Sequence, residues 1–129
     1  MLSSWYKEQL IVSFDIPGRP LPKERPRVVP RKGKMVAYTP KKTRAYEQSV
    51  AQVASIAMRG NEPYTGLVVV RCDFYRARRN ADPDNLFKAV ADAMQGIVYK
   101  NDNQVVEMHA VWHRDKDEHA HVDVWATSE

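Results

Sequence analysis

Apolar and polar residues alternate along several short stretches of this chain, which is the pattern of a half-buried β-strand. In the first stretch Leu10, Val12, Phe14 and Ile16 fall on one face. The strands that the pattern predicts cover residues 10–16, 67–75, 104–113 and 120–125, with a short additional strand at 34–38. The β-branched run at 67–75 is typical of a central strand.

Apolar residues recur every three or four positions in two other stretches, as they do on the buried face of a helix. The first predicted helix has Thr39 as its N-cap, followed by a proline, and ends near Gly60. The second has Asp82 as its N-cap, again followed by a proline, and closes at Gly96. Both helices are expected to pack on the sheet.

Together these elements predict an α/β (α+β) fold: one small domain over residues 1–129, with a mixed sheet of about four to five strands and two helices. The last two strands are expected to pair as a hairpin through residues 114–118. A chain of 129 residues has room for one modest core. No apolar run approaches the roughly 20 residues that span a bilayer, and no signal peptide is recognisable at the start. With Cys72 as the single cysteine, a cytoplasmic location is expected.

The net charge of +4 hides a strong asymmetry along the chain. Residues 19–44 contain ten basic residues and one acid, so this segment carries +9 and the remainder carries −5. Five prolines and several apolar residues in the segment indicate a stiff, partly ordered arm (residues 17–44) rather than a disordered tail. A local concentration of positive charge is typical of phosphate binding. The residues expected to contact DNA phosphates are Lys23, Arg25, Arg27, Arg31, Lys32, Lys34, Lys41, Lys42 and Arg44.

Acidic residues gather around the start of the second helix. Asp82 and Asp84 are two positions apart, Lys88 follows one turn later, and Asp102 lies just ahead of the next strand. Asp84 and Lys88 share a helix face. Clustered carboxylates repel one another unless a proton or a metal ion compensates them. Asp102 reaches the other two acids only if its strand runs beside the strand that ends near Tyr75.

Carboxylate oxygens are the ligands that Mg²⁺ and Mn²⁺ prefer, whereas zinc sites favour Cys and His. A carboxylate-bound divalent ion next to a basic surface suits hydrolysis of a phosphodiester. Lys88 would then position the scissile phosphate or stabilise its developing charge. The structural alternative is that Asp82 only caps the helix, while Asp84 and Lys88 form an exposed ion pair worth roughly 0.2–0.5 kcal/mol.

The motifs resemble those of the RusA family of Holliday junction endonucleases, which are common in bacteria and their prophages. The matching segments are residues 14–27, 38–47, 82–88, 92–94 and 102–106. The resemblance implies that Asp82, Asp84 and Asp102 are metal-binding catalytic acids and that Lys88 is the catalytic lysine. It also implies a Mg²⁺-dependent homodimer that nicks a four-way DNA junction symmetrically. Family members often have a second acid where this chain has Asn101, which weakens an acidic role at that position.

A C2 dimer is also expected independently of the resemblance, because resolving a junction takes two cuts related by a twofold axis.

Other functions remain open at this point. A non-catalytic nucleic-acid-binding module would need only the basic arm, and a nuclease acting on RNA or on DNA flaps would share the chemistry. His119 and His121 lie on one side of the last strand, but without cysteines or a clear fourth ligand a zinc site there is the weaker interpretation.

Overall fold

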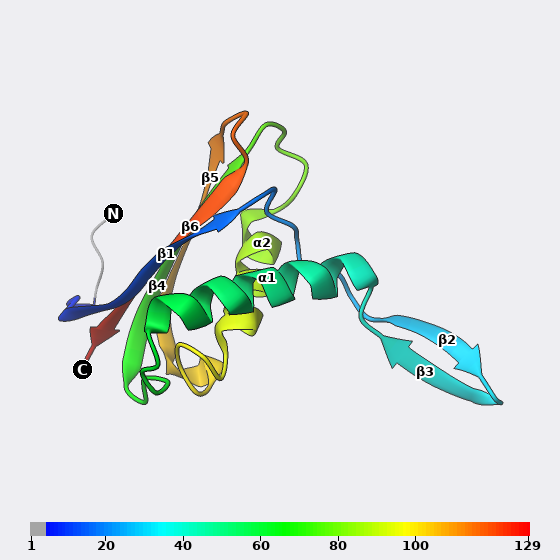
Figure 1. The fold of residues 1–129 in the computed structure, drawn as a ribbon, viewed down its shortest axis with the longest axis horizontal. Helices are drawn as coiled ribbons and strands as arrows, with labels where there is room; N and C mark the ends of the chain where they lie inside the picture. Colours follow the sequence, from blue (N-terminus) through cyan, green and yellow to red (C-terminus); the bar gives the residue numbers. More distant parts are fainter. Residues whose placement is uncertain (1–4) are drawn as a thin grey trace.

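A four-stranded sheet with both helices on one side forms the body of the protein (Figure 1). The computed structural model describes residues 5–129. Its elements are β1 (Gln9–Pro17), β2 (Arg27–Arg31), β3 (Lys34–Tyr38), α1 (Lys41–Met58), β4 (Leu67–Arg76), α2 (Pro83–Met94), the 3₁₀ turn η1 (Asp102–Gln104), β5 (Val105–Arg114) and β6 (His119–Thr127). This confirms the predicted α+β class with a mixed sheet. Within the described residues no helix is long and apolar enough to cross a membrane.

The core lies between the helices and one face of the sheet. On β4 the inward residues are Val68, Val70, Cys72 and Phe74, as their alternation predicts, and all four are fully buried. The apolar stripe of α2 and the inward faces of β1 and β6 complete the cluster. Burial raises the pKa of the Cys72 thiol, with the charge of Asp73 adding to the effect, so this cysteine is chemically inert.

The strand order is β1-β6-β4-β5, and only β4 and β5 run parallel. A parallel pair needs a crossover connection, and α2 supplies it between β4 and β5. The predicted hairpin of the last two strands is wrong, because β4 lies between β5 and β6. The connection between β5 and β6 therefore passes over the end of β4 and spans two strand spacings. Tight hairpin turns favour glycine, and this connection contains none.

The helix ends differ slightly from the prediction. Helix α1 begins at Lys41, with Pro40 rather than Thr39 at the cap position, and Arg59 ends it in the left-handed conformation. Asp82 is the backbone N-cap of α2 with a proline next to it, as predicted, and the helix stops at Met94.

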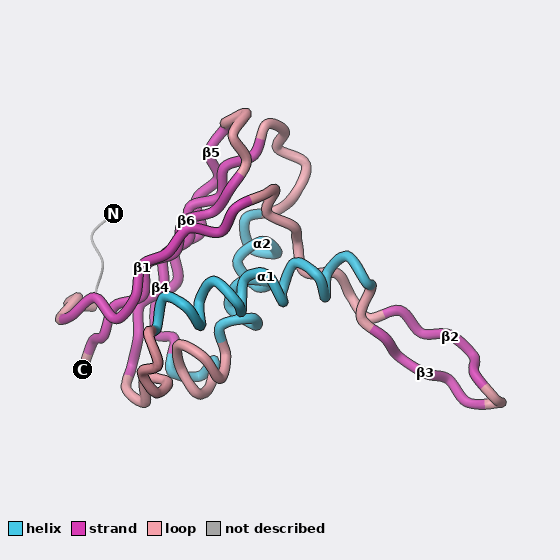
Figure 2. Tube along the Cα trace, viewed as in Figure 1, coloured by secondary structure: helices cyan, strands magenta, loops and turns pink. Residues whose placement is uncertain are grey.

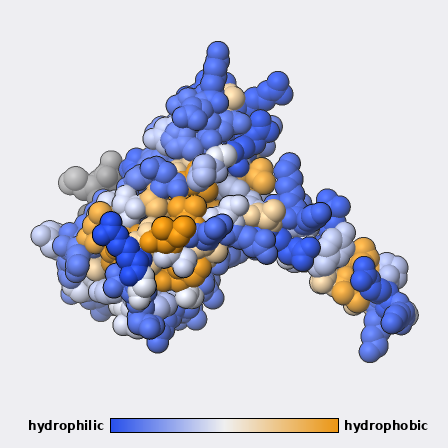
Figure 3. All heavy atoms as spheres, in the orientation of Figure 1, coloured by the Kyte–Doolittle hydropathy of each residue, from blue (hydrophilic) through white to orange (hydrophobic). Residues whose placement is uncertain are grey.

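Strands β2 and β3 form a hairpin that projects away from the body (Figure 1). The predicted strand at 34–38 is confirmed, but its partner β2 was not predicted. The two-residue turn has positive φ at Lys32 (51°) and Gly33 (76°), as a type I′ turn requires. Of the hairpin's residues only Val29 is half-buried. Figure 3 shows apolar atoms on this ribbon among hydrophilic ones, consistent with the exposure of Val28 and Met35.

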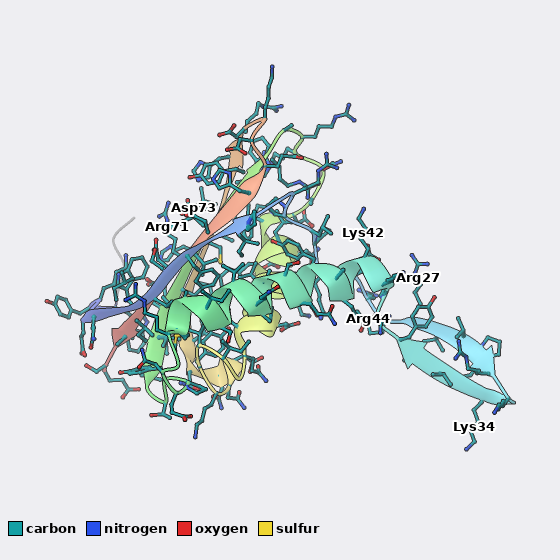
Figure 4. All side chains as sticks on the ribbon, viewed as in Figure 1. Arg27, Lys34, Lys42, Arg44, Arg71 and Asp73 are labelled. Carbon is teal, nitrogen blue, oxygen red and sulfur yellow. The ribbon has the colours of Figure 1, made fainter. Side chains whose placement is uncertain are left out.

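The sheet face opposite the helices is polar and hydrogen-bonded. Arg71 donates two hydrogen bonds to Asp73, and both side chains lie on β4 (Figure 4). His121 on β6 pairs with Asp15 (2.8 Å) and Asp123 (3.1 Å). His119 stacks on Tyr75 instead, with ring centroids 4.3 Å apart. The two histidines considered for zinc therefore have separate partners.

The pairing of His121 makes stability depend on pH. Burial alone would lower the pKa of His121, but hydrogen bonds and charges of Asp15 and Asp123 raise it above the ordinary value. A raised folded-state pKa stabilises the protein fully below the unfolded pKa, near 6.5, and this contribution disappears as the pH rises through the folded value. We expect the melting temperature of the wild type to fall more between pH 6 and pH 8 than that of His121→Gln. Equal pH dependence in the two proteins, measured by thermal denaturation, would contradict this assignment.

Candidate active site

The acidic segment lies where the chain leaves the sheet and enters α2. Figure 2 shows the connecting loop, residues 77–82, running from the end of β4 to the start of α2. Asp82 ends this loop, yet its carboxylate makes no capping hydrogen bond to the helix. The interpretation of Asp82 as only a helix cap therefore finds no support in the geometry.

Asp84, Lys88 and Asp102 line one hollow of about 400 Å³ between α2 and the start of β5. Asp92, which sequence reasoning did not single out as a site residue, lines the same hollow. The parallel pairing of β5 with β4 satisfies the condition under which Asp102 approaches α2.

Asp82 lies in a neighbouring hollow of about 360 Å³, together with Arg79 and Asn80. Asn85 lines both hollows and joins them. The structure thus brings Asp84, Asp102 and Lys88 into one hollow and places Asp82, the third predicted acid, in the adjoining hollow.

All four predicted catalytic side chains are exposed and unpaired within the described part of the chain. Asp82, Asp84, Lys88 and Asp102 take part in no side-chain hydrogen bond or ion pair with residues 5–129. In particular, Asp84 and Lys88 do not form the i,i+4 pair that the structural alternative assumed. Their charges are available to a ligand.

Gln104 holds the loop that carries Asp102. Its buried side-chain oxygen accepts hydrogen bonds from the backbone N–H groups of Lys100 (2.9 Å) and Asn101 (2.8 Å). Its amide nitrogen donates to the carbonyls of Tyr64 and Gly66, both at 2.8 Å. The Asn101 side chain accepts from the backbone N–H of residue 103 and completes a capping box around η1. Asn101 thus has a structural role that needs no charge.

The donor set is compatible with a hard divalent cation. Within residues 5–129 no group of three or more His, Cys, Asp or Glu side chains is assembled for metal binding. Mg²⁺, however, is usually held by one or two carboxylates, with waters and substrate phosphates as its other ligands. The carboxylates of Asp84 and Asp102 in one hollow fit that requirement.

Lys23 ties the basic arm to the body. Its ammonium lies 2.5 Å from Glu47 and 3.3 Å from Asp92, and its backbone N–H donates to the carbonyl of Asn85 at 3.0 Å. Burial lowers the pKa of Lys23, but the hydrogen bonds to the two acids outweigh it and raise the value. Lys23, which was predicted to contact DNA, is therefore paired with acids of the protein itself.

The other predicted DNA contacts are exposed. Figure 4 shows Arg27 and Lys34 on the hairpin, and Lys42 and Arg44 at the adjoining end of α1. The remaining members, Arg25, Arg31, Lys32 and Lys41, are also exposed on these segments. Together they form a cationic extension at the start of α1 (Figure 4).

Comparison with known proteins identifies the same family as the motifs do. Residues 17–125 match the family described as endodeoxyribonuclease RusA. The uncharacterized protein YqaN of Bacillus subtilis (strain 168) is 30% identical over 119 residues, which covers 75% of this chain and 83% of that protein.

The Gln104 network generates a stability prediction. Gln104→Leu leaves buried backbone donors and acceptors without partners, and we expect it to lower the free energy of unfolding by about 2–3 kcal/mol. Chemical denaturation measures this loss. Gln52→Leu, an exposed position on α1, is the matched control and should change stability by less than about 0.5 kcal/mol. A similar effect of both substitutions would show that Gln104 does not organise the loop.

Proposed function

Because the chain belongs to the RusA endodeoxyribonuclease family, we propose that it resolves Holliday junctions by paired symmetric nicks in DNA recombination and repair. Hydrolysis of DNA and dependence on a divalent metal are properties of the family. The observation that carries the proposal is the set of unpaired charged groups on the first half of α2 and on the loop before β5. Three carboxylates and one ammonium are exposed there without partners among the described residues, beside a cationic arm.

Each residue receives a role from its position. Asp84 and Asp102 would hold the divalent ion in their common hollow, and Asp82 would approach it from the adjoining one. When bound, Mg²⁺, or Mn²⁺ in its place, supplies Lewis acidity and lowers the pKa of bound water. Lys88, in the hollow with Asp84 and Asp102, would contact the non-bridging oxygens of the scissile phosphate and stabilise the charge that grows on them.

The cationic arm would position the junction without reading its sequence. Contacts from Lys and Arg to phosphates fix orientation and supply salt-dependent affinity. The hairpin residues 27–38 carry four positive charges and no acid, and they project away from the body of the protein (Figure 1). This geometry suits the binding of one arm of a branched DNA while another strand lies at the start of α2.

Two symmetric cuts require two sites, so we propose a homodimer with twofold symmetry as the active form. Size-exclusion chromatography with light scattering tests it directly: a mass of twice 14.8 kDa is expected. A monomer at the concentrations that support junction cleavage would exclude paired nicking within one dimer.

Two other functions remain as alternatives. A non-catalytic DNA-binding module would bind a four-way junction but leave it intact with Mg²⁺, with Mn²⁺ and with chelator. A nuclease for flaps or RNA would cut those substrates faster than the junction. Incubation of the purified protein with a labelled panel of junction, flap, duplex and RNA substrates distinguishes the three functions.

The role of Asp82 leads to a specific prediction. Asp82→Asn should reduce junction cleavage by at least 100-fold and should keep or tighten junction binding, because a negative charge that repels phosphate is removed. Cleavage on gels and binding by fluorescence anisotropy provide the two measurements. Asp117→Asn, in the exposed turn between β5 and β6, is the matched control and should be active. Loss of binding by Asp82→Asn would argue against a catalytic role.

The hairpin leads to a second prediction. Replacing residues 28–37 by two glycines removes three cations, so junction affinity should fall at least 10-fold at about 0.1 M salt and the salt slope should decrease by about 2–3. The melting temperature should change by less than about 3 °C, because the hairpin is exposed and outside the core. Unchanged affinity in a folded variant would remove the hairpin from the DNA interface.

A further inference from the structure

A third hollow, of about 330 Å³, lies at the end of β4, outside the groups discussed so far. Three arginines line it, namely Arg19, Arg76 and Arg78, with Asn80, Ala77 and Glu118. None of these arginines belongs to the predicted DNA-contact set. The question is which ligand this cationic hollow would take.

Arg76 is the most informative of the three residues. Its side chain is buried, with 5% of the residue exposed, and points to the helix side of the sheet. One terminal nitrogen (Nη2) donates to Asn80 Oδ1 at 2.8 Å, whereas Nε and Nη1 have no partner. Within residues 5–129 no carboxylate forms an ion pair with it. A buried guanidinium without a counter-ion is unfavourable unless an anion compensates it.

Glu118 compensates that charge only in part: its charge favours the ionised form of Arg76, but the two side chains form no ion pair. One of its oxygens accepts from Arg19 Nε at 2.8 Å, and the other accepts from the backbone N–H of Ala77 at 3.0 Å. The hydrogen bond from the Ala77 backbone contributes most, and the one from Arg19 adds to it. Together they lower the pKa of Glu118, so this side chain is ionised at neutral pH. The hollow therefore has three positive charges against one negative charge and retains a net charge of +2.

The hollow adjoins the candidate active site. Asn80 lines both the arginine hollow and the hollow that contains Asp82. Asn85 in turn joins the Asp82 hollow to the one that contains Asp84, Lys88 and Asp102. A nucleic-acid strand that follows these three hollows passes from the arginines to the acids.

We propose that the arginine hollow is a phosphate subsite, in which Arg76, Arg78 and Arg19 receive a backbone phosphate of the strand whose neighbouring phosphodiester lies at the acids. This inference rests on the proposed nuclease function, which it makes more specific. The ligand is a phosphodiester monoanion, and the subsite fixes the distance along the strand between a bound phosphate and the cut. Arg78 is exposed and meets the phosphate from outside, while the charge of Arg76 attracts it from below.

Binding to a four-way junction in EDTA tests the subsite without requiring cleavage. Arg78→Ala should bind about 5–10-fold more weakly at 0.1 M salt, with a salt slope smaller by about one, because one phosphate contact is lost. Arg59→Asn is the matched control, since it removes a charge at the far end of α1, and asparagine tolerates the left-handed conformation there. It should leave the slope unchanged. If thermal denaturation shows that Arg76→Met is folded, it should bind as weakly as Arg78→Ala. If Arg76→Met does not fold, the result for Arg78→Ala alone decides the test.

A scan with single neutral methylphosphonate linkages locates the contact. The wild type should lose affinity at one linkage within about three nucleotides of the cut, and Arg78→Ala should have lost that sensitivity while keeping the rest of the profile. An unchanged slope and an unchanged profile in Arg78→Ala would overturn the subsite. Stabilisation by inorganic phosphate that Arg78→Ala abolishes, with no change in DNA binding, would instead indicate a site for a free anion. If the subsite behaves as expected but no metal supports cleavage, the nuclease proposal fails and the subsite stands.

Discussion

The parallel pairing of β4 with β5 is the constraint on which the site depends. Two parallel neighbours cannot be joined by a tight turn, so the chain crosses over through α2, which then lies against both strands. The crossover places the start of α2 at the end of β4 and brings the loop before β5 back along the helix. Asp84 and Asp102, eighteen positions apart in the sequence, line one hollow for this reason. Gln104 then fixes the loop through four hydrogen bonds to two segments of backbone.

Uncompensated charge is the second common feature of this region. The carboxylates of Asp82, Asp84 and Asp102 and the guanidinium of Arg76 have opposite signs, and none of them forms an ion pair with the described residues. Other charges in the body are paired, as Lys23 with Glu47 and Arg71 with Asp73 show, whereas the cations of the hairpin are exposed to solvent. Because unpaired charge reduces folding stability, its concentration along three adjoining hollows is best explained by a ligand with both anionic and metal-binding groups. A DNA phosphodiester with a divalent cation is such a ligand.

Most of the fold was accessible from the sequence, because alternation identifies strands and helical spacing identifies helices. The error in the sheet concerns which strands pair. Alternation shows which face of a strand is buried but not which strand lies beside it, so β6 was predicted to pair with β5, whereas it pairs with β4 and β1. The partner strand β2 was missed because it is basic and contains Pro30, which disfavours a strand assignment. The four candidate catalytic residues were chosen from their spacing and from the family resemblance, and their catalytic role stays a prediction. Asp92 was not chosen, because only the fold brings it into one hollow with Asp102, and Arg76 was not, because its burial depends on neighbours distant in sequence. The inward alternation of Cys72, Phe74 and Arg76 was the available signal for a buried arginine.

We propose that Asp84 and Asp102 bind one divalent cation together, next to a bound DNA strand. Electron paramagnetic resonance of Mn²⁺, titrated into the protein with a junction that carries an uncleavable phosphate analogue, tests it most directly. We expect tight Mn²⁺ binding by the wild type, and we expect Asp84→Asn and Asp102→Asn each to weaken it by at least 10-fold, with DNA binding intact. Unchanged Mn²⁺ affinity in Asp102→Asn would show that the loop before β5 takes no part in the metal site, and it would contradict the account.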